Sequence, residues 1–312
     1  MELPTASGWV RPVNDISLRI AAGESLGLVG ESGSGKTMLS LTLMGLLPPG
    51  ARVSGEALLS SPEAAPKNLA TLRAEDDWRA VRGRDIAMVF QEPMTSLNPV
   101  MRVGAQIAES IRAHEPHLAG SDLQRRVHAA LERAAVPDPG ARATQFPHQL
   151  SGGLRQRVMI AMALAANPKL LIADEPTTAL DVTVQKHMLV LLDRLRREMQ
   201  LALLFITHDL GVVAKVADRI AVMYAGRIIE EGLTQDVLLS PQHPYTQGLL
   251  AASPTIVRGQ LIPIPGTVPQ LTSLPPGCAF APRCGYRRPE CDQAVPAFRP
   301  PHTDHSARCV LL

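Results

Sequence analysis

A glycine-rich segment, residues 30–37 (Gly-Glu-Ser-Gly-Ser-Gly-Lys-Thr), matches the pattern G-x-x-x-x-G-K-[ST] that suits a polyphosphate site. Glycines let successive backbone N–H groups turn inward around phosphate oxygens, and the helix expected to follow adds a favourable dipole. The Lys36 ammonium would reach the β- and γ-phosphates, and the Thr37 hydroxyl would ligate Mg²⁺. A glycine turn that binds nothing is the alternative, and the apolar run before the loop disfavours it. The predicted nucleotide-binding residues here are Gly30, Glu31, Ser32, Gly33, Ser34, Gly35, Lys36 and Thr37.

Two adjacent carboxylates end a second apolar run, residues 170–175, which reads Leu-Leu-Ile-Ala-Asp-Glu. A buried strand would deliver both acids to its carboxyl end, beside the phosphate loop. Asp174 would then hold Mg²⁺, directly or through water, and Glu175 would polarise the water that attacks the γ-phosphate. Taken alone, such paired acids are more often a helix cap, and the glycine-rich loop reverses that preference.

His208 follows a third apolar run that ends Leu-Leu-Phe-Ile-Thr. A single histidine at the end of a strand is usually structural. In a chain that also carries a triphosphate loop and paired acids, we interpret His208 as a sensor that hydrogen-bonds the γ-phosphate and the attacking water.

A second anion site is indicated by residues 150–153, Leu-Ser-Gly-Gly, which come directly before a helical pattern. A hydroxyl, exposed backbone N–H groups and a helix dipole would converge there at Ser151, Gly152 and Gly153. One nucleotide does not need two such cradles from one chain, so we expect this one to cover the ATP of a facing subunit. An ordinary N-capped helix is the alternative, and the motif taken alone would favour it.

The elements that must position these residues indicate an α/β fold. Apolar runs at residues 25–30, 170–173 and 201–207 are continuous rather than alternating, which is typical of parallel strands buried on both faces. Helical patterns at residues 37–47 and 182–199 separate them. We therefore predict a mostly parallel sheet covered by helices.

Two regions depart from this alternation of strands and helices. Residues of about 92–165 show helical patterns at 103–113, 121–135 and 155–166 with no strand between them, so we predict a helical subdomain. From about residue 237 prolines become dense, which argues against long regular elements. The predicted division is a nucleotide-binding domain at 1–236 and a loop-rich extension at 237–312.

Composition excludes some function classes. With Lys+Arg 31 and Asp+Glu 29 the formal net charge is +2, which gives no basic footprint for nucleic acid. We see no secretory signal and no apolar stretch of the roughly 18–20 residues that a membrane-spanning helix needs. We expect a cytoplasmic protein, so in any membrane process another polypeptide must supply the pore.

The motifs together resemble the nucleotide-binding subunits of ABC transporters, in order and spacing, over nearly the whole chain. The resemblance implies that residues 30–37 are the Walker A loop, 150–153 the signature, 170–175 the Walker B strand and His208 the H-loop, with ATP and Mg²⁺ as cofactors. Residues 179–181 (Ala-Leu-Asp) would be the D-loop, with Asp181 near nucleotide. It also implies that Gln91, between an apolar run and the helical subdomain, contacts Mg²⁺ or the attacking water. From there Gln91 would report the nucleotide state to the subdomain that contacts the permeases.

Several longer stretches are similar to the ATPases of peptide and nickel importers, namely residues 82–99, 174–185, 243–250 and 263–291. The resemblance is to the oligopeptide/dipeptide branch and its D-type member. It implies a peripheral subunit on the cytoplasmic face of the cell membrane, paired with a second ABC ATPase, two permeases and, indirectly, a solute-binding protein. Nickel or glutathione as cargo, a non-transport ABC ATPase of DNA repair or translation, and an interaction protein with an inactive site are the alternatives. The last is disfavoured because Lys36 and Glu175 are both present.

All of the chain's cysteines lie in its last 35 positions, at Cys278, Cys284, Cys291 and Cys309. In a cytoplasmic chain such a cluster is unlikely to form structural disulfides. Four thiolates suit an iron–sulfur cluster or zinc, and free thiols stay open as well. The resemblance implies a [4Fe–4S] cluster that fastens the extension, with His302 and His305 near enough in sequence to substitute as ligands.

The N-terminal segment differs from the family pattern. Family members usually begin with a strand and an aromatic residue that stacks on adenine, whereas this chain starts late. Trp9 is the nearby aromatic residue and the candidate for that contact. The expectation is that the chain is truncated or begins downstream of the usual start.

Overall fold

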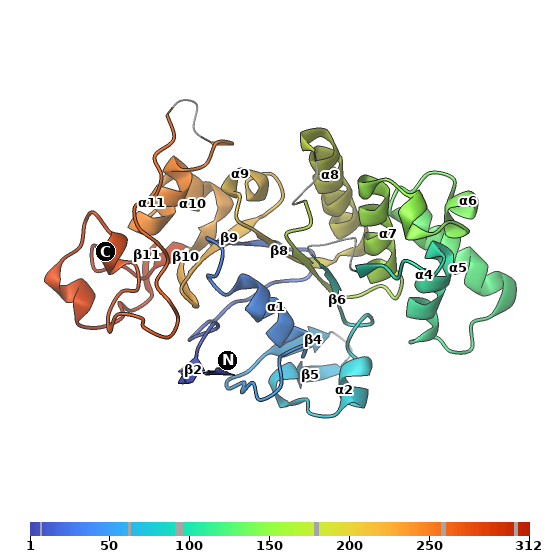
Figure 1. The fold of residues 1–312 in the computed structure, drawn as a ribbon, viewed down its shortest axis with the longest axis horizontal. Helices are drawn as coiled ribbons and strands as arrows, with labels where there is room; N and C mark the ends of the chain where they lie inside the picture. The colour runs from blue at the N-terminus through green and yellow to red at the C-terminus, as the bar shows by residue number, and fades with distance from the viewer. Residues whose placement is uncertain (7, 62–63, 91–95, 178–180, 257–259, 303–304) are drawn as a thin grey trace. The chain divides into compact units, whose positions relative to one another are not determined.

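A computed structural model describes residues 1–6, 8–61, 64–90, 96–177, 181–256, 260–302 and 305–312. The chain forms two compact units. The first contains Met1–Arg19, Ser25–Leu72 and Phe205–Leu312, and the second contains Ile20–Glu24 and Arg73–Leu204. Figure 1 colours these segments along the chain.

The first unit is built around a mixed sheet with the strand order β11-β12-β10-β9-β3. β3 (Ser25–Val29) and β9 (Arg219–Tyr224) are parallel, whereas β10 (Arg227–Leu233), β12 (His305–Ala307) and β11 (Arg299–His302) continue it antiparallel. Its helices are α1 (Lys36–Leu43), α9 (Leu210–Val213), α10 (Thr234–Leu239) and α11 (Pro244–Ala251). Two hairpins complete the unit, β1 (Leu3–Thr5) with β2 (Gly8–Val10) and β4 (Leu58–Ser61) with β5 (Ala64–Asn68).

Burial places the strand before the phosphate loop in the core of its unit. Every residue of β3 is buried, and β9 is buried from its second residue onward. A continuous apolar strand cannot face water on either side, so helices must cover both faces. At Gly27 an added Cβ would lie 2.3 Å from Val213 Cγ1, so α9 packs too closely on β3 for any side chain there.

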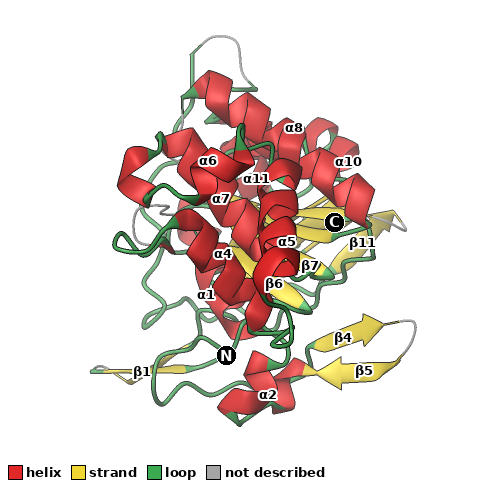
Figure 2. Cartoon of the chain, turned by 90° about the vertical axis from the view of Figure 1, so that its right-hand side faces the viewer, coloured by secondary structure: helices red, strands yellow, loops and turns green. Residues whose placement is uncertain are grey.

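The second unit pairs β6 (Ile86–Val89) with β7 (Leu170–Asp174) in parallel and is otherwise mainly helical. Figures 1 and 2 show its helices α4 to α7 grouped together. The helices are α2 (Glu75–Arg79), α4 (Val103–Arg112), α5 (Gly120–Arg133), α6 (Pro139–Ala143), α7 (Gly152–Leu164) and α8 (Val182–Met199). β8 (Ala202–Thr207) follows α8, and the boundary between the units falls within it.

The α/β fold and the parallel strands are confirmed, and no strand occurs in the described residues 96–165. The helix bounds agree with the predicted ones within a few residues, and for α8 they are the same. The antiparallel edge formed by β10, β12 and β11 was not predicted. The division at residue 237 stays a prediction.

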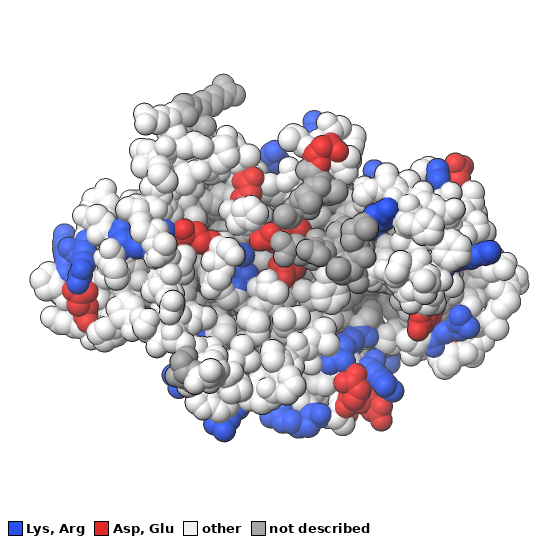
Figure 3. All heavy atoms as spheres, viewed as in Figure 1, with Lys and Arg blue, Asp and Glu red and all other residues white. Residues whose placement is uncertain are grey.

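In the described part of the chain no helix combines the length and apolarity needed to cross a membrane. On the face drawn in Figure 3, basic and acidic side chains are interspersed rather than gathered into a field of one sign.

Candidate nucleotide site

The phosphate loop joins β3 to α1 and depends on its glycines for its backbone. Gly33 and Gly35 have φ of 79° and 107°, in the left-handed region that side chains disfavour. At Gly35 a Cβ would also lie 2.0 Å from the carbonyl oxygen of Pro12. Directly before the helix, the loop backbone therefore adopts a curved conformation that requires glycine at these positions.

The Lys36 ammonium lies inside the curved backbone of the phosphate loop. The residue is buried, and its Nζ donates to the carbonyl oxygens of Gly30 at 2.7 Å and Glu31 at 3.0 Å. Thr37, Ser32 and Gly33 are exposed. A cation surrounded by inward-turned backbone, with an exposed hydroxyl beside it, fits a phosphate chain with a bound Mg²⁺.

His208 is exposed at the end of β8, where it can meet a ligand. The next residue fixes the turn, because Asp209 Oδ1 accepts hydrogen bonds from the Gly211 N–H and the Thr255 hydroxyl, both at 2.8 Å. The turn that directly follows His208 is thus held by the Asp209 carboxylate.

In the second unit, β7 ends at Asp174, and Glu175 follows it directly. Asp174 is 3% exposed, and the carboxyl end of β7 is where it would meet a metal ion. Glu175 has a φ of 47°, a strained conformation for a residue other than glycine. Such strain persists only where surrounding contacts maintain it, and it is found most often at functional sites.

Two glutamines that the sequence analysis did not single out bond the two residues after Glu175, one through its backbone and the other through its side chain. Gln156 of α7 is 1% exposed, and its Nε2 donates to the Pro176 carbonyl oxygen at 2.8 Å. Gln185 of α8 donates to the Thr177 hydroxyl at 3.2 Å. The helix that follows the Leu-Ser-Gly-Gly motif is therefore tied to the segment that carries the predicted base.

The Leu-Ser-Gly-Gly motif begins α7 with its polar groups toward solvent. Ser151 is the N-cap, and its hydroxyl accepts the Leu154 N–H at 3.4 Å. Ser151 and Gly152 are exposed, and a Cβ at Gly152 would meet nothing within 4 Å. This surface is open to a ligand or another chain, as expected for a cradle that acts on a facing subunit.

Two family models match the chain. The model described as "ABC transporter" matches residues 13–178, and the one described as "Oligopeptide/dipeptide transporter, C-terminal region" matches residues 229–291. The chain belongs to the ABC transporter family.

Curated relatives extend this likeness over the full length. The dipeptide transport ATP-binding protein DppD of Bacillus subtilis is 46% identical over 98% of this chain and 91% of its own length. The oligopeptide transport ATP-binding protein OppD of the same organism is 47% identical over 99% of this chain and 86% of its own length. A putative peptide import ATP-binding protein of Brucella melitensis is 48% identical over 96% of this chain and 90% of its own length.

Solved structures agree. A dimeric bacterial ABC transporter cassette has a TM-score of 0.64 and 27% identity, covering 75% of this chain and 95% of its own. A dimeric post-hydrolysis state of an ATP-binding cassette bound to ADP and phosphate has a TM-score of 0.62 and 26% identity, with the same coverage. This ABC subunit is an ATPase with a P-loop fold.

The structure describes most of the ABC motifs, though not all of them. Gln91 lies outside the described residues, as do Ala179 and Leu180 of the predicted D-loop. Asp181 is exposed and caps α8 by accepting the Val184 N–H at 2.9 Å. The loop and His208 belong to the first unit, and Ser151, Asp174, Glu175 and Asp181 to the second.

Trp9, the candidate for the adenine contact, is 46% exposed in the β1–β2 hairpin. The guanidinium of Arg52 lies over its ring, 4.2 Å from the centroid. One face of the ring is therefore occupied by a cation, and the adenine contact stays a prediction.

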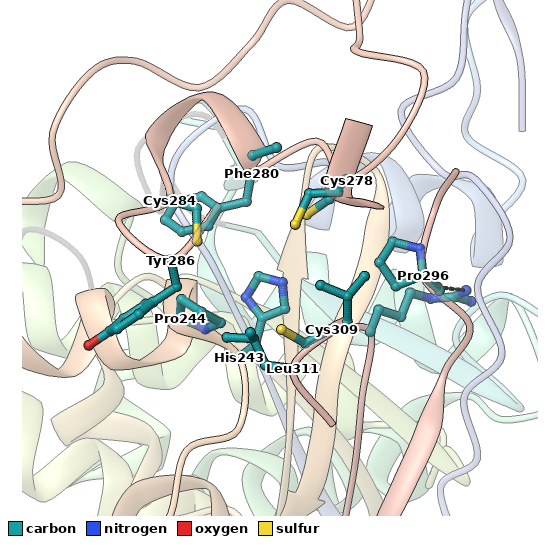
Figure 4. A pocket seen from close by; sticks show the side chains of 13 residues that line it. His243, Pro244, Cys278, Phe280, Cys284, Tyr286, Pro296, Cys309 and Leu311 are labelled. Atoms are coloured by element: carbon teal, nitrogen blue, oxygen red, sulfur yellow. Dashed lines mark hydrogen bonds between the residues drawn. The ribbon is translucent and has the colours of Figure 1, made fainter. Parts of the chain in front are cut away.

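The four cysteines of this ABC ATPase line one pocket beside His243 and Phe280. Figure 4 shows Cys278, Cys284 and Cys309 around this pocket. Burial raises the pKa of Cys278 to about 11 and also raises the pKa values of Cys284 and Cys309, so these thiols are protonated at neutral pH without a metal. Among the described residues, no three His, Cys, Asp or Glu side chains form a group that could hold a metal ion. The donor types suit a cluster, whereas their present positions do not form a ligand set.

Proposed function

We propose that this chain is the ATP-hydrolysing subunit of an importer for di- and oligopeptides. The observation that carries the proposal is the presence of both matched regions in one chain, the ABC cassette and the C-terminal region of oligopeptide/dipeptide transporters. The names of its relatives, which are peptide import ATPases at 46–48% identity, support the cargo class.

The proposed assembly contains a second ABC ATPase, two transmembrane permeases and a solute-binding protein that selects the peptide. The chain would lie on the cytoplasmic face of the cell membrane, held there by the permeases. The helical subdomain is the proposed contact to them, because in the sequence Gln91 lies between the β6 strand and that subdomain. Solved relatives that are dimeric support pairing of two cassettes.

Within that pair we assign the roles as follows. Residues 30–37 would bind the phosphates of ATP, and Thr37, Asp174 and Gln91 would hold Mg²⁺, which would neutralise charge on the β- and γ-phosphates. Glu175 orients and polarises the attacking water, and His208 bonds the γ-phosphate. The cradle at Ser151–Gly153, with Asp181, completes the site of the partner cassette.

Peptide uptake tests the cargo. Cells that lack this chain are expected to lose growth on di- and oligopeptides as an amino-acid source, and the wild-type gene should restore it. A gene that carries Lys36→Ala should give uptake of a labelled dipeptide about 100-fold lower than the wild-type gene, because the loop then no longer binds the phosphates of ATP. Glutamate uptake is a control for general energy supply. Loss of nickel uptake with normal peptide uptake would refute the peptide assignment.

For the four-cysteine pocket we propose a [4Fe–4S] cluster that fastens the extension. The proposal is supported by the number and type of the donors and by their shared pocket. When bound, the cluster would supply cross-links between Cys278, Cys284, Cys291 and Cys309, and it requires the thiols to lose their protons and approach one another.

Metal analysis of anaerobically purified protein tests this. We expect about four iron and four sulfide per chain, with visible absorption, as one cubane requires. Cys291→Ser should lower the iron content and the thermal midpoint together. Colourless protein, or protein that holds one zinc instead, would refute the cluster.

A further inference from the structure

Glu31, the second residue of the phosphate loop, is held by side chains from the C-terminal region of the chain. Its carboxylate accepts two hydrogen bonds from the Arg283 guanidinium, at 2.7 and 3.0 Å. Its backbone N–H donates to the Tyr245 hydroxyl at 2.8 Å. We name these three residues, Glu31, Tyr245 and Arg283, the loop clasp.

Buried aromatic packing fixes both outer members of the loop clasp. Tyr245 of α11 is 0% exposed and packs on Tyr224 of β9, with ring centroids 4.6 Å apart. Phe280, three residues before Arg283, contacts both rings, at 5.3 and 5.4 Å. The Arg283 side chain is 4% exposed, and its Nε donates to the Pro265 carbonyl oxygen at 2.8 Å. Neither side chain can leave Glu31 without disrupting buried packing.

This arrangement explains the residue types of the sequence His-Pro-Tyr at 243–245. His243 caps α11 by accepting the Tyr245 N–H on Nδ1 at 3.0 Å, and Pro244 occupies the first turn. The His243 N–H in turn donates to Glu230 of β10, which is fully buried. The cap thus aims the Tyr245 hydroxyl at the loop, starting from the core sheet.

Besides holding Glu31 in place, Arg283 neutralises its charge. A carboxylate on the phosphate loop would repel triphosphate, and a bidentate guanidinium cancels that charge where it arises. Glu31 is 30% exposed on its side chain, so solvent alone screens it only in part.

We propose that Tyr245 and Arg283 are positioning residues of the nucleotide site. Through them the C-terminal region fixes the backbone at Glu31, near the start of the phosphate loop, and neutralises the charge of the Glu31 carboxylate. This rests on the assignment of residues 30–37 as the ATP-binding loop. The two side chains act through Glu31 and do not touch nucleotide themselves.

The test measures binding of AMP, ADP and the imido analogue of ATP to the full chain by calorimetry. Arg283→Gln is expected to weaken binding of the analogue by about five- to tenfold, of ADP by less, and of AMP hardly at all, because the freed carboxylate repels phosphates. In the assembled transporter the KM for ATP should rise while kcat changes by less than about twofold. Tyr245→Phe keeps the ring and should also raise the KM, because the Glu31 N–H loses its acceptor.

Rescue separates this role from a structural one. Adding Glu31→Gln to Arg283→Gln should restore most of the affinity, since the unpaired carboxylate is then absent. Arg287→Gln, in the same extension, is the matched control because Arg287 pairs with Asp292. Equal losses for all three nucleotides, or no rescue, would overturn the inference. If Arg283→Gln matches the wild type, this inference alone fails, whereas a wild-type chain that binds no nucleotide overturns the loop assignment with it.

Discussion

Glu175→Gln is expected to reduce ATP hydrolysis by at least about 100-fold while ATP still binds. In the proposed role this carboxylate polarises the attacking water, and general base catalysis contributes about 10²–10⁴-fold. Glutamine keeps the side-chain length and the left-handed backbone at this position but lacks basicity. In the proposed pair of cassettes hydrolysis would separate the two chains, so the variant should accumulate as a closed pair in ATP, visible by size-exclusion chromatography.

A matched control is available on the same unit. Glu198 pairs with Arg194 at 3.8 Å on the surface of α8, so Glu198→Gln should hydrolyse ATP at the wild-type rate. Turnover by Glu175→Gln equal to that of this control would remove Glu175 from the proposed role and direct attention to His208.

Replacing Ser151 with Ala and Gly152 with Asp is expected to stop hydrolysis of the ATP that the partner cassette binds, without weakening binding of ATP to this chain. The open surface at the start of α7 has no neighbour within 4 Å of a Gly152 Cβ, so aspartate fits there without a clash. Its negative charge at a helix N-terminus would instead repel the γ-phosphate presented by a partner. Loss of such an electrostatic contact lowers kcat by about 10²–10³-fold.

Gly140→Asp is the control for the charge alone. Gly140 lies in α6 of the same unit, and a Cβ there would come no nearer than 3.8 Å to His128. Because it adds the same charge away from the Leu-Ser-Gly-Gly motif, hydrolysis should stay near the wild-type rate. A similar loss in both variants would indicate a general effect of charge on the helical subdomain.

The central elements could be predicted because their signals are local. β3 and β7 are continuous apolar runs, and α8 shows a helical period from its Asp181 cap to its last turn. The phosphate loop was predictable for the same reason, since its backbone needs glycine at fixed positions. These constraints act within a few residues, so a single sequence displays them.

The remaining contacts depend on partners far apart in the chain. Arg283 meets Glu31 across 252 positions, and neither residue is unusual in its own surroundings. β11 and β12 come from a proline-rich segment with weak strand propensity. β12 forms because the edge of β10 offers unpaired backbone groups, and β11 pairs in turn with β12. Gln156 likewise gives no local sign that it will bond the backbone beyond Glu175.

The central claim is that ATP is enclosed between two chains, each supplying a part that the other lacks. Its most direct test compares hydrolysis by the assembled transporter with photolabelling of this chain by azido-ATP, using the Ser151→Ala, Gly152→Asp double variant. We predict that labelling stays within about twofold of wild type while hydrolysis of the partner's ATP falls by about 100-fold. Hydrolysis of the partner's ATP at the wild-type rate by the assembled double variant would contradict the claim.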